Sequence, residues 1–232
     1  MRWFLDTLPP TQRALWPRLY ETPAHFVLYG GTALALRLGH RVSEDFDFFS
    51  NEPFNPQQLR ASVPYLRGSR ILQNLANTLT CLVGASNGVK VSFFGKLPLR
   101  SIQAPDQGPQ NSIRIASLLD LAGTKAAVVQ QRARRKDYLD MAALITAGIS
   151  LSSALSAGAG IFGQEFNPML TLKALSYFGD PELRDASGRD LPRDVRDTLQ
   201  RAVSEVDVSK IRPLETTPKI CGSDDPPSAN TR

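Results

Sequence analysis

Two adjacent glycines, Gly30 and Gly31, stand where a short apolar run ends and a stretch with helical spacing of leucines and alanines begins. A glycine pair at the start of a helix lets the backbone approach an anion closely, and the unpaired amides of the first turn point at that anion. This arrangement predicts a seat for phosphate groups over residues 30–32. A glycine pair alone is as often a plain turn, because glycine is a common turn residue.

Asp45 and Asp47 follow closely, and they alternate with Phe46 and Phe48 at a period of two. That period predicts a strand with both carboxylates on one face and both aromatic rings packed in a core on the other. Paired oxygen ligands suit a magnesium or manganese ion held together with the phosphates of a nucleotide. An isolated Asp-x-Asp is more often solvated surface, so the prediction depends on its combination with the glycine pair and the helix.

The sequence GGTALALRLGHRVSEDFDFF, residues 30–49, resembles the first motif of the DNA polymerase β type nucleotidyltransferase superfamily. The form is that of the AbiEii/AbiGii (MenT-like) toxin family of bacterial abortive-infection and toxin–antitoxin systems. That family also has a lysine-containing helix, matched here by the spacing of Ser117, Asp120 and Lys125. Its later Arg-x-Lys-Asp-x-x-Asp motif is matched by RRKDYLD, residues 134–140. The three motifs stand in the expected order.

The resemblance implies a role for each matched residue. Asp45 and Asp47 would bind the metal ion, Lys125 would hold the phosphates, and Asp137 would position or deprotonate the acceptor hydroxyl. These four residues make the expected catalytic set. From local sequence alone, Lys125 is equally well a surface lysine. A carboxylate favoured at a helix start is the alternative interpretation of Asp137. The expected nucleotide-binding set is Gly30, Gly31, Thr32, Arg41, Ser43 and Lys125.

As the resemblance implies, we expect a nucleotidyltransferase that moves a nucleotide from a nucleoside triphosphate to an acceptor hydroxyl, with magnesium bound and pyrophosphate leaving. The family further suggests a toxin of a type IV toxin–antitoxin or abortive-infection system, with the 3′ end of a transfer RNA as acceptor. Its antitoxin would be a separate chain. Four cations, Arg132, Arg134, Arg135 and Lys136, are candidates for contact with an RNA backbone, although such runs usually mark a solvated helix end.

Two departures from the family pattern bear on the chemistry. Gly31 stands where the family often has serine, which keeps the backbone amide and loses a hydroxyl. Ser92 stands on a predicted strand where many superfamily members supply a third carboxylate, so the number of metal ions, one or two, stays open. Ser92 also motivates an alternative, a module that binds a nucleotide without turnover. A second alternative is transfer to a small molecule, as in antibiotic-modifying nucleotidyltransferases.

The elements that must position these residues indicate an α/β (α+β) protein, with a small mixed β-sheet followed by a helical part. The strand of Asp45 is followed by a predicted hairpin over 78–94, which extends the sheet. Three apolar stripes, over about 115–126, 138–145 and 195–206, predict helices. No internal repeat is visible, which excludes solenoids and propellers.

We expect a nucleotidyltransferase core over 1–112, a helical part over 113–207 that completes the active-site cleft, and a flexible tail over 208–232. A bend is required before Asp137, because on one straight helix Asp137 and Lys125 would lie about 18 Å apart. Residues near 130–135 are the expected place for this bend.

The chain has 232 residues, a net charge of +5 and two cysteines, Cys81 and Cys221, far apart in the sequence. This composition is typical of a globular protein without a disulfide framework and favours a reducing, cytoplasmic location. The amino terminus lacks the apolar run of a signal peptide. The uncharged stretch 141–164 resembles a membrane span, but its glycines and serines predict two short helices, the first ending near Gly148 and the second capped by Ser150. No membrane partner is therefore expected.

Overall fold

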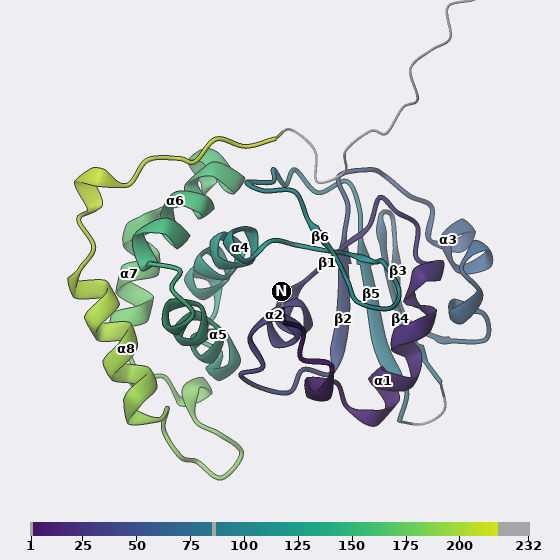
Figure 1. The fold of residues 1–232 in the computed structure, drawn as a ribbon, viewed down its shortest axis with the longest axis horizontal. Coiled ribbons are helices and arrows are strands. Elements are labelled where there is room, and N and C mark those ends of the chain that lie inside the picture. The colour runs from purple at the N-terminus through teal and green to yellow at the C-terminus, as the bar shows by residue number, and fades with distance from the viewer. Residues whose placement is uncertain (1, 85–86, 218–232) are drawn as a thin grey trace, which may run out of the picture.

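The computed structural model describes residues 2–84 and 87–217 and has a mixed α/β fold, in which a seven-stranded sheet stands beside a group of helices (Figure 1). The strand order is β3-β4-β5-β2-β1-β7-β6. The pairs β2–β5 and β1–β7 are parallel, and the other pairs are antiparallel. The strands are β1 (Val27–Tyr29), β2 (Asp45–Phe49), β3 (Arg70–Leu75), β4 (Thr78–Val83), β5 (Val89–Phe94), β6 (Asp106–Gln107) and β7 (Arg114–Ile115).

The helices divide into two groups in space. Helices α4 to α8 form a helical part on one side of the sheet, and α1 and α3 lie toward the opposite end of the molecule (Figure 1). Helix α2 lies between the sheet and the helical part, where it contacts both α4 and α5. The helices are α1 (Pro10–Leu15), α2 (Gly30–Leu38), α3 (Pro56–Ser62), α4 (Leu118–Gln131), α5 (Arg135–Thr146), α6 (Leu151–Phe162), α7 (Pro168–Ser176) and α8 (Arg193–Ser204).

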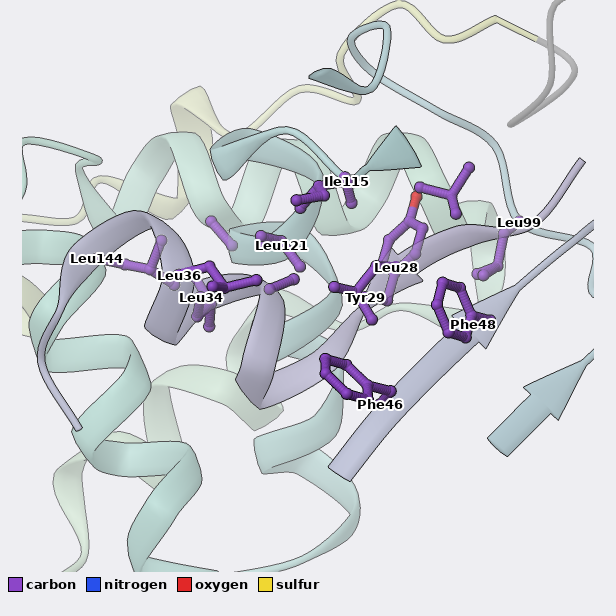
Figure 2. Packing of buried hydrophobic residues seen from close by; sticks show 14 of the residues in the cluster. Leu28, Tyr29, Leu34, Leu36, Phe46, Phe48, Leu99, Ile115, Leu121 and Leu144 are labelled. Carbon is purple, nitrogen blue, oxygen red and sulfur yellow. The ribbon is translucent and has the colours of Figure 1, made fainter. Parts of the chain in front are cut away.

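The acidic strand β2 has the two faces that its period of two predicts. Phe46 and Phe48 are fully buried, whereas Asp45 and Asp47 on the other face are partly exposed. Phe48 stacks on Phe93 of β5, with ring centroids 5.3 Å apart. Figure 2 shows Phe46 and Phe48 in an apolar core that β1, β2 and α2 share. Burial of these rings anchors the strand and fixes both carboxylates on the opposite face.

Most of the predicted elements are confirmed. The hairpin is β4 and β5, the second and third apolar stripes are α5 and α8, and the bend separates α4 from α5. The first stripe begins later than predicted, because Ile115 belongs to β7 and Ser117 caps α4 by accepting a hydrogen bond from the amide of Asp120. Four elements have no counterpart among the predicted ones: β3, β6, α3 and α7. Strand β3 is an edge strand that is exposed along its whole length, so no alternation of buried and exposed residues marks it.

Two expected boundaries differ from the structure. The sheet continues past residue 112, because β7 pairs with β1. Residues 208–217, the first part of the expected flexible tail, have a defined course, and Thr217 pairs with Ser101 as an isolated bridge. The rest of that expected tail, 218–232, lies outside the described residues.

The uncharged stretch divides as its glycines and serines predict. Gly148 has a φ of 94° after α5 ends, and Ser150 caps α6 through the amide of Ser153. Among the described residues, no single helix is long and apolar enough to cross a membrane. One pair of helical segments, Arg135–Thr146 and Leu151–Glu165, passes that test by length and composition only, and the two are bent by 116°.

Candidate active site

A small cavity of about 150 Å³ lies where the start of α2, strand β2 and helices α4 and α5 meet. Both predicted metal ligands, Asp45 and Asp47, line it, and Lys125 enters from α4. The other residues that line it are Tyr29, Gly30, Gly31, Arg41, Ser43, Phe49, Thr124, Val128, Arg132 and Lys136. Most of the residues that the sequence assigned to metal and phosphate binding therefore meet in one place.

Gly30 and Gly31, which we call the glycine corner, lie at the start of α2 and pack against the acidic strand β2. Gly30 has a φ of 74°, which favours glycine, and a Cβ at this position would lie 3.0 Å from Oδ2 of Asp47. A Cβ at Gly31 would collide with the guanidinium group of Arg41 and lie 2.9 Å from Oγ of Ser43. Close packing thus requires small residues at both positions, and it brings the predicted phosphate seat next to the acidic pair.

Thr32, the third residue of the predicted phosphate seat, has a different place. Its side chain is buried, and its hydroxyl donates a hydrogen bond to the backbone carbonyl of Asp45. It is not among the residues that line the cavity. Thr32 therefore connects the start of α2 to β2 by a hydrogen bond, and its side chain does not reach the cavity.

The electrostatic environment of Asp47 comes from its own strand β2, from the neighbouring strand β5 and from α5. Burial raises the pKa of Asp47 above its usual value, and the charge of Asp45 raises it further. Lys90, a hydrogen bond from Ser92 and the charge of Lys136 act in the opposite direction without cancelling the rise. A cation near Asp47 would favour its charged form, so the site is well suited to bind one.

Lys90 is a residue that the sequence analysis missed. Its Nζ lies 2.7 Å from Oδ2 of Asp45, and it stands on β5 two positions before Ser92. Because the register of β5 against β2 decides this contact, no local signal in the sequence indicates it. Among the described residues, no group of three or more His, Cys, Asp and Glu side chains is placed to hold a metal ion.

The bend between α4 and α5 brings Lys125 and Asp137 together as predicted. Nζ of Lys125 lies 2.7 Å from Oδ1 of Asp137 and 2.6 Å from Oδ2 of Asp140. Asp137 is fully buried, and its second oxygen lies 2.9 Å from Nε of Arg132. Both carboxylate oxygens of Asp137 are therefore already paired with cations.

Asp140 joins the helical part to the loop that precedes β2. Its Oδ1 lies 2.6 Å from Nε of Arg41 and 2.7 Å from Nε2 of His40. Burial by itself would raise the pKa of Asp140, but the hydrogen bond from His40 and the charges of Lys125 and Arg41 outweigh it and hold that pKa well below its usual range. Asp140 follows Asp137 by three positions, so the two share one face of α5, a spacing that is readable in the sequence.

The four cations predicted as RNA contacts divide into two pairs, one that lines the cavity and one that contacts residues after α7. Arg132 and Lys136 line the cavity. Nη1 of Arg134 lies 2.8 Å from Oε2 of Glu182, and Arg135 donates to the backbone carbonyls of Leu183 and Arg189. Two of the four cations thus belong to the site, and the other two contact residues beyond α7.

Comparison with known proteins agrees with this geometry. A family model described as "Nucleotidyl transferase AbiEii toxin, Type IV TA system" matches residues 14–211. An uncharacterized protein of Aquifex aeolicus is 38% identical over 119 residues, which are 50% of this chain and 55% of that protein. The chain thus matches about half the length of this curated relative.

Two solved structures share the fold. MenT4, a nucleotidyltransferase toxin of Mycobacterium tuberculosis, aligns with a TM-score of 0.56 at 17% identity and covers 89% of this chain and 85% of its own. A candidate nucleotidyltransferase of H. pylori aligns with a TM-score of 0.50 at 19% identity, over 84% of this chain and 92% of its own. At such identities the alignments support the fold, and the family model, which covers most of the sequence, supports the assignment. The chain belongs to the AbiEii family of nucleotidyltransferase toxins.

Proposed function

We propose that this protein transfers a nucleotidyl group from a nucleoside triphosphate to an acceptor hydroxyl, in the cavity between β2 and helices α4 and α5. The observation that carries this proposal is the contact between Asp47 and the glycine corner at Gly30, which puts a predicted phosphate seat beside two carboxylates. Family membership supports the same reaction. We further propose that the protein acts as a toxin and that a separate antitoxin chain opposes it.

The acidic pair fits a divalent cation. Asp45 and Asp47 offer hard oxygen donors from one face of β2, both are partly exposed, and glycine at position 30 leaves space beside Oδ2 of Asp47. When bound there, a magnesium or manganese ion would neutralise charge on the triphosphate. The raised pKa of Asp47 agrees with such a site, because a carboxylate that lacks a close cation is costly to bury.

The remaining side chains serve to bind and align the triphosphate. Gly30 and Gly31, the first residues of α2, line the cavity, and the amide end of a helix attracts anions. Lys125 and Lys136 line it as well and add positive charge. The acceptor oxygen attacks the α-phosphorus, the bond from that phosphorus to pyrophosphate breaks on the opposite side, and the hydroxyl proton passes to solvent water or to the departing pyrophosphate. This step requires alignment and charge neutralisation rather than covalent help from the protein.

Asp137 is better suited to a positioning role than to the proton transfer expected from the sequence. It is fully buried, and its oxygens are occupied by Lys125 and Arg132. An acceptor hydroxyl therefore has no access to it. We assign Asp137 the task of holding these two cations toward the cavity, which makes it essential for binding geometry without contact to substrate.

The proposed acceptor is RNA, in particular the 3′ end of a transfer RNA, as the family suggests. Four cations line the cavity. Arg41 and Lys125 are paired with the buried carboxylates of Asp140 and Asp137. The other two, Arg132 and Lys136, are exposed at its edge. A basic rim attracts a polyanion, whereas a cationic antibiotic would require an acidic acceptor pocket. The charge of this site therefore favours RNA over a small cationic molecule.

The experiment is incubation of the protein with total RNA, magnesium and each of the four labelled nucleoside triphosphates in turn. We expect label from at least one triphosphate to enter an RNA of transfer-RNA size with the parent protein and not with Asp45→Ala or Asp47→Asn. Asp197→Asn, a matched change at an exposed carboxylate on α8, is expected to retain labelling. Magnesium-dependent labelling that survives in both active-site variants, or no labelling by the parent, would contradict the proposal.

Of the two variants, Asp47→Asn separates loss of activity from loss of folding more clearly. Because burial and Asp45 raise the pKa of Asp47, the neutral amide removes a charge that the fold disfavours. The variant is therefore expected to fold at least as well as the parent at neutral pH, so loss of labelling reports on chemistry. In cells, induction of the parent is expected to arrest growth, and induction of Asp47→Asn is expected not to.

A further inference from the structure

The parallel register of β2 and β5 places two side chains of β5 beside the acidic pair. Lys90 is opposite Asp45, and Ser92 is opposite Asp47. Side chains paired in this way project from the same face of a sheet, while Val91, on the other face of β5, is buried in the core. The acidic face of the sheet thus carries two carboxylates, one hydroxyl and one ammonium group.

We propose that Lys90 supplies, beside Asp45, the positive charge that a second divalent cation would otherwise supply, so that this face holds one divalent cation with its nucleotide. The inference rests on the proposed nucleotidyl transfer and adds a residue to it. Lys90 then replaces a metal ion as the second source of positive charge at the acidic pair.

The oxygen ligands on the acidic face of the sheet are enough for one divalent cation and too few for two. Two metal ions in a two-metal site lie about 3.5–4 Å apart and share carboxylates between them. Here Oδ2 of Asp45 lies 2.7 Å from the ammonium of Lys90, so a second cation at that oxygen would meet a like charge. The position opposite Asp47, where a third carboxylate would help, is the neutral Ser92, which hydrogen-bonds Asp47.

The location of Lys90 suits this task. Its side chain is 41% exposed and that of Asp45 is 33% exposed, so the ammonium is accessible to solvent beside Asp45. An ammonium group is a compact charge on a flexible stem, and it requires no set of anionic ligands. Lys125 does not take this place beside Asp45, because its ammonium is held by Asp137 and Asp140 on α5.

The test counts manganese ions by electron paramagnetic resonance on the full chain saturated with a non-hydrolysable triphosphate analogue. Two close manganese ions give a dipole-coupled spectrum, whereas a single ion does not. We expect one Mn²⁺ per nucleotide-bound chain and no coupled signal for the parent. Two coupled ions in the parent would overturn the proposal for Lys90 alone, while a nucleotide complex with no Mn²⁺ at all would overturn the proposed function.

A double variant, Lys90→Ala with Ser92→Asp, removes the ammonium and adds a third carboxylate. We expect it to bind a second Mn²⁺ with a coupled signal. Lys90→Arg, which keeps the charge, and Lys173→Ala, which removes an exposed lysine on α7, are expected to stay at one ion. If the double variant has a native circular dichroism spectrum and still binds one ion, Lys90 does not exclude the second and the proposal is overturned.

Turnover gives an independent readout. We expect Lys90→Ala to lower kcat about tenfold or more, with little change in KM for the triphosphate, because the lost charge acts mainly on the transition state. Lys90→Arg is expected to restore most of the rate. A Lys90→Ala variant with parental kcat would show that Lys90 only neutralises the surface near Asp45, and this too would overturn the proposal.

Discussion

At the scale of single residues, the site contains carboxylates in two environments. Asp45 and Asp47 are partly exposed, and they retain room for a cation from solution. Asp137 and Asp140 are fully buried and are satisfied by lysine, arginine and histidine side chains of the protein itself. We infer that the first pair binds, while the second pair orients the cations that face the cavity.

The first prediction concerns Asp140→Asn. At neutral pH we expect a loss of about 3 kcal/mol in the free energy of unfolding, because the variant leaves buried cations with reduced compensation. The folded-state pKa of Asp140 is held well below its usual value of 3.8, so its contribution is fully present above that value. As pH falls through the window below 3.8, the parent loses this contribution, and the two proteins should converge in stability.

Urea unfolding at intervals from pH 7 to about pH 2 measures the onset of this convergence, because the folded-state pKa lies well below 3.8. Asp197→Asn, the same change at an exposed carboxylate, should cost well under 1 kcal/mol across the range. A stability difference between the parent and Asp140→Asn that stays constant down to about pH 2 would mean that the ionised carboxylate is not the source of the stabilisation.

At the scale of elements, Gly30 at the start of α2 has both a backbone role and a role in the site. Gly30 must turn the chain from β1 into the helix at a φ of 74°, and it must also leave room for the carboxylate of Asp47. The left-handed φ is a property of the backbone alone, whereas the space for Asp47 belongs to the site. Gly188 is a glycine with a similar backbone and no such neighbour: its φ is 77°, and beyond its two chain neighbours no atom lies within 4 Å of where its Cβ would be.

The second prediction compares Gly30→Ala with Gly188→Ala. Each substitution is expected to cost about 1–2 kcal/mol, because alanine disfavours a left-handed backbone. Only Gly30→Ala should also reduce nucleotide transfer strongly, since its methyl group would displace the carboxylate of Asp47. Thermal unfolding and RNA labelling measure the two effects. Equal activity of the two variants would contradict the assigned contact between the glycine corner and the acidic pair.

At the scale of the whole molecule, the sheet and the helical part are joined through the site. Asp140 on α5 pairs with His40 and Arg41, which precede β2, and β7 completes the sheet from beyond residue 112. The carboxylate of Asp120 on α4 accepts hydrogen bonds from the backbone amides of Ile102 and Gln103. We therefore expect the parts on either side of residue 112 to be stable only together.

The third prediction is a single cooperative unfolding transition for the full chain. Both tryptophans, Trp3 and Trp16, lie in the amino-terminal part, so fluorescence reports on that part, while far-ultraviolet circular dichroism reports mainly on the helices. The two probes should give the same denaturant midpoint. A fragment of residues 1–112, which lacks β7 and α4, is expected not to fold. Separate midpoints, or a stable fragment, would show that the two regions fold independently.

Local patterns in the sequence were enough to locate the acidic strand, the glycine corner and the hairpin. In each case the signal is a short periodicity or a turn residue, and such signals depend only on neighbours in the chain. The bend that unites Lys125 with Asp137 also followed from the sequence, because a straight helix cannot bring them together. Strand β3 gave no such signal, since it is exposed on both faces.

What the sequence by itself determined is therefore the local arrangement of the candidate site: Asp45 and Asp47 on one face of a strand, and two glycines at a helix start. The tertiary structure decided which cations surround them. Strand register placed Lys90 beside Asp45, and helix packing buried Asp140 against His40, a hundred positions away. The physical reason is that ion pairs between distant segments depend on register and packing, which are properties of the assembled core and leave no trace in local spacing.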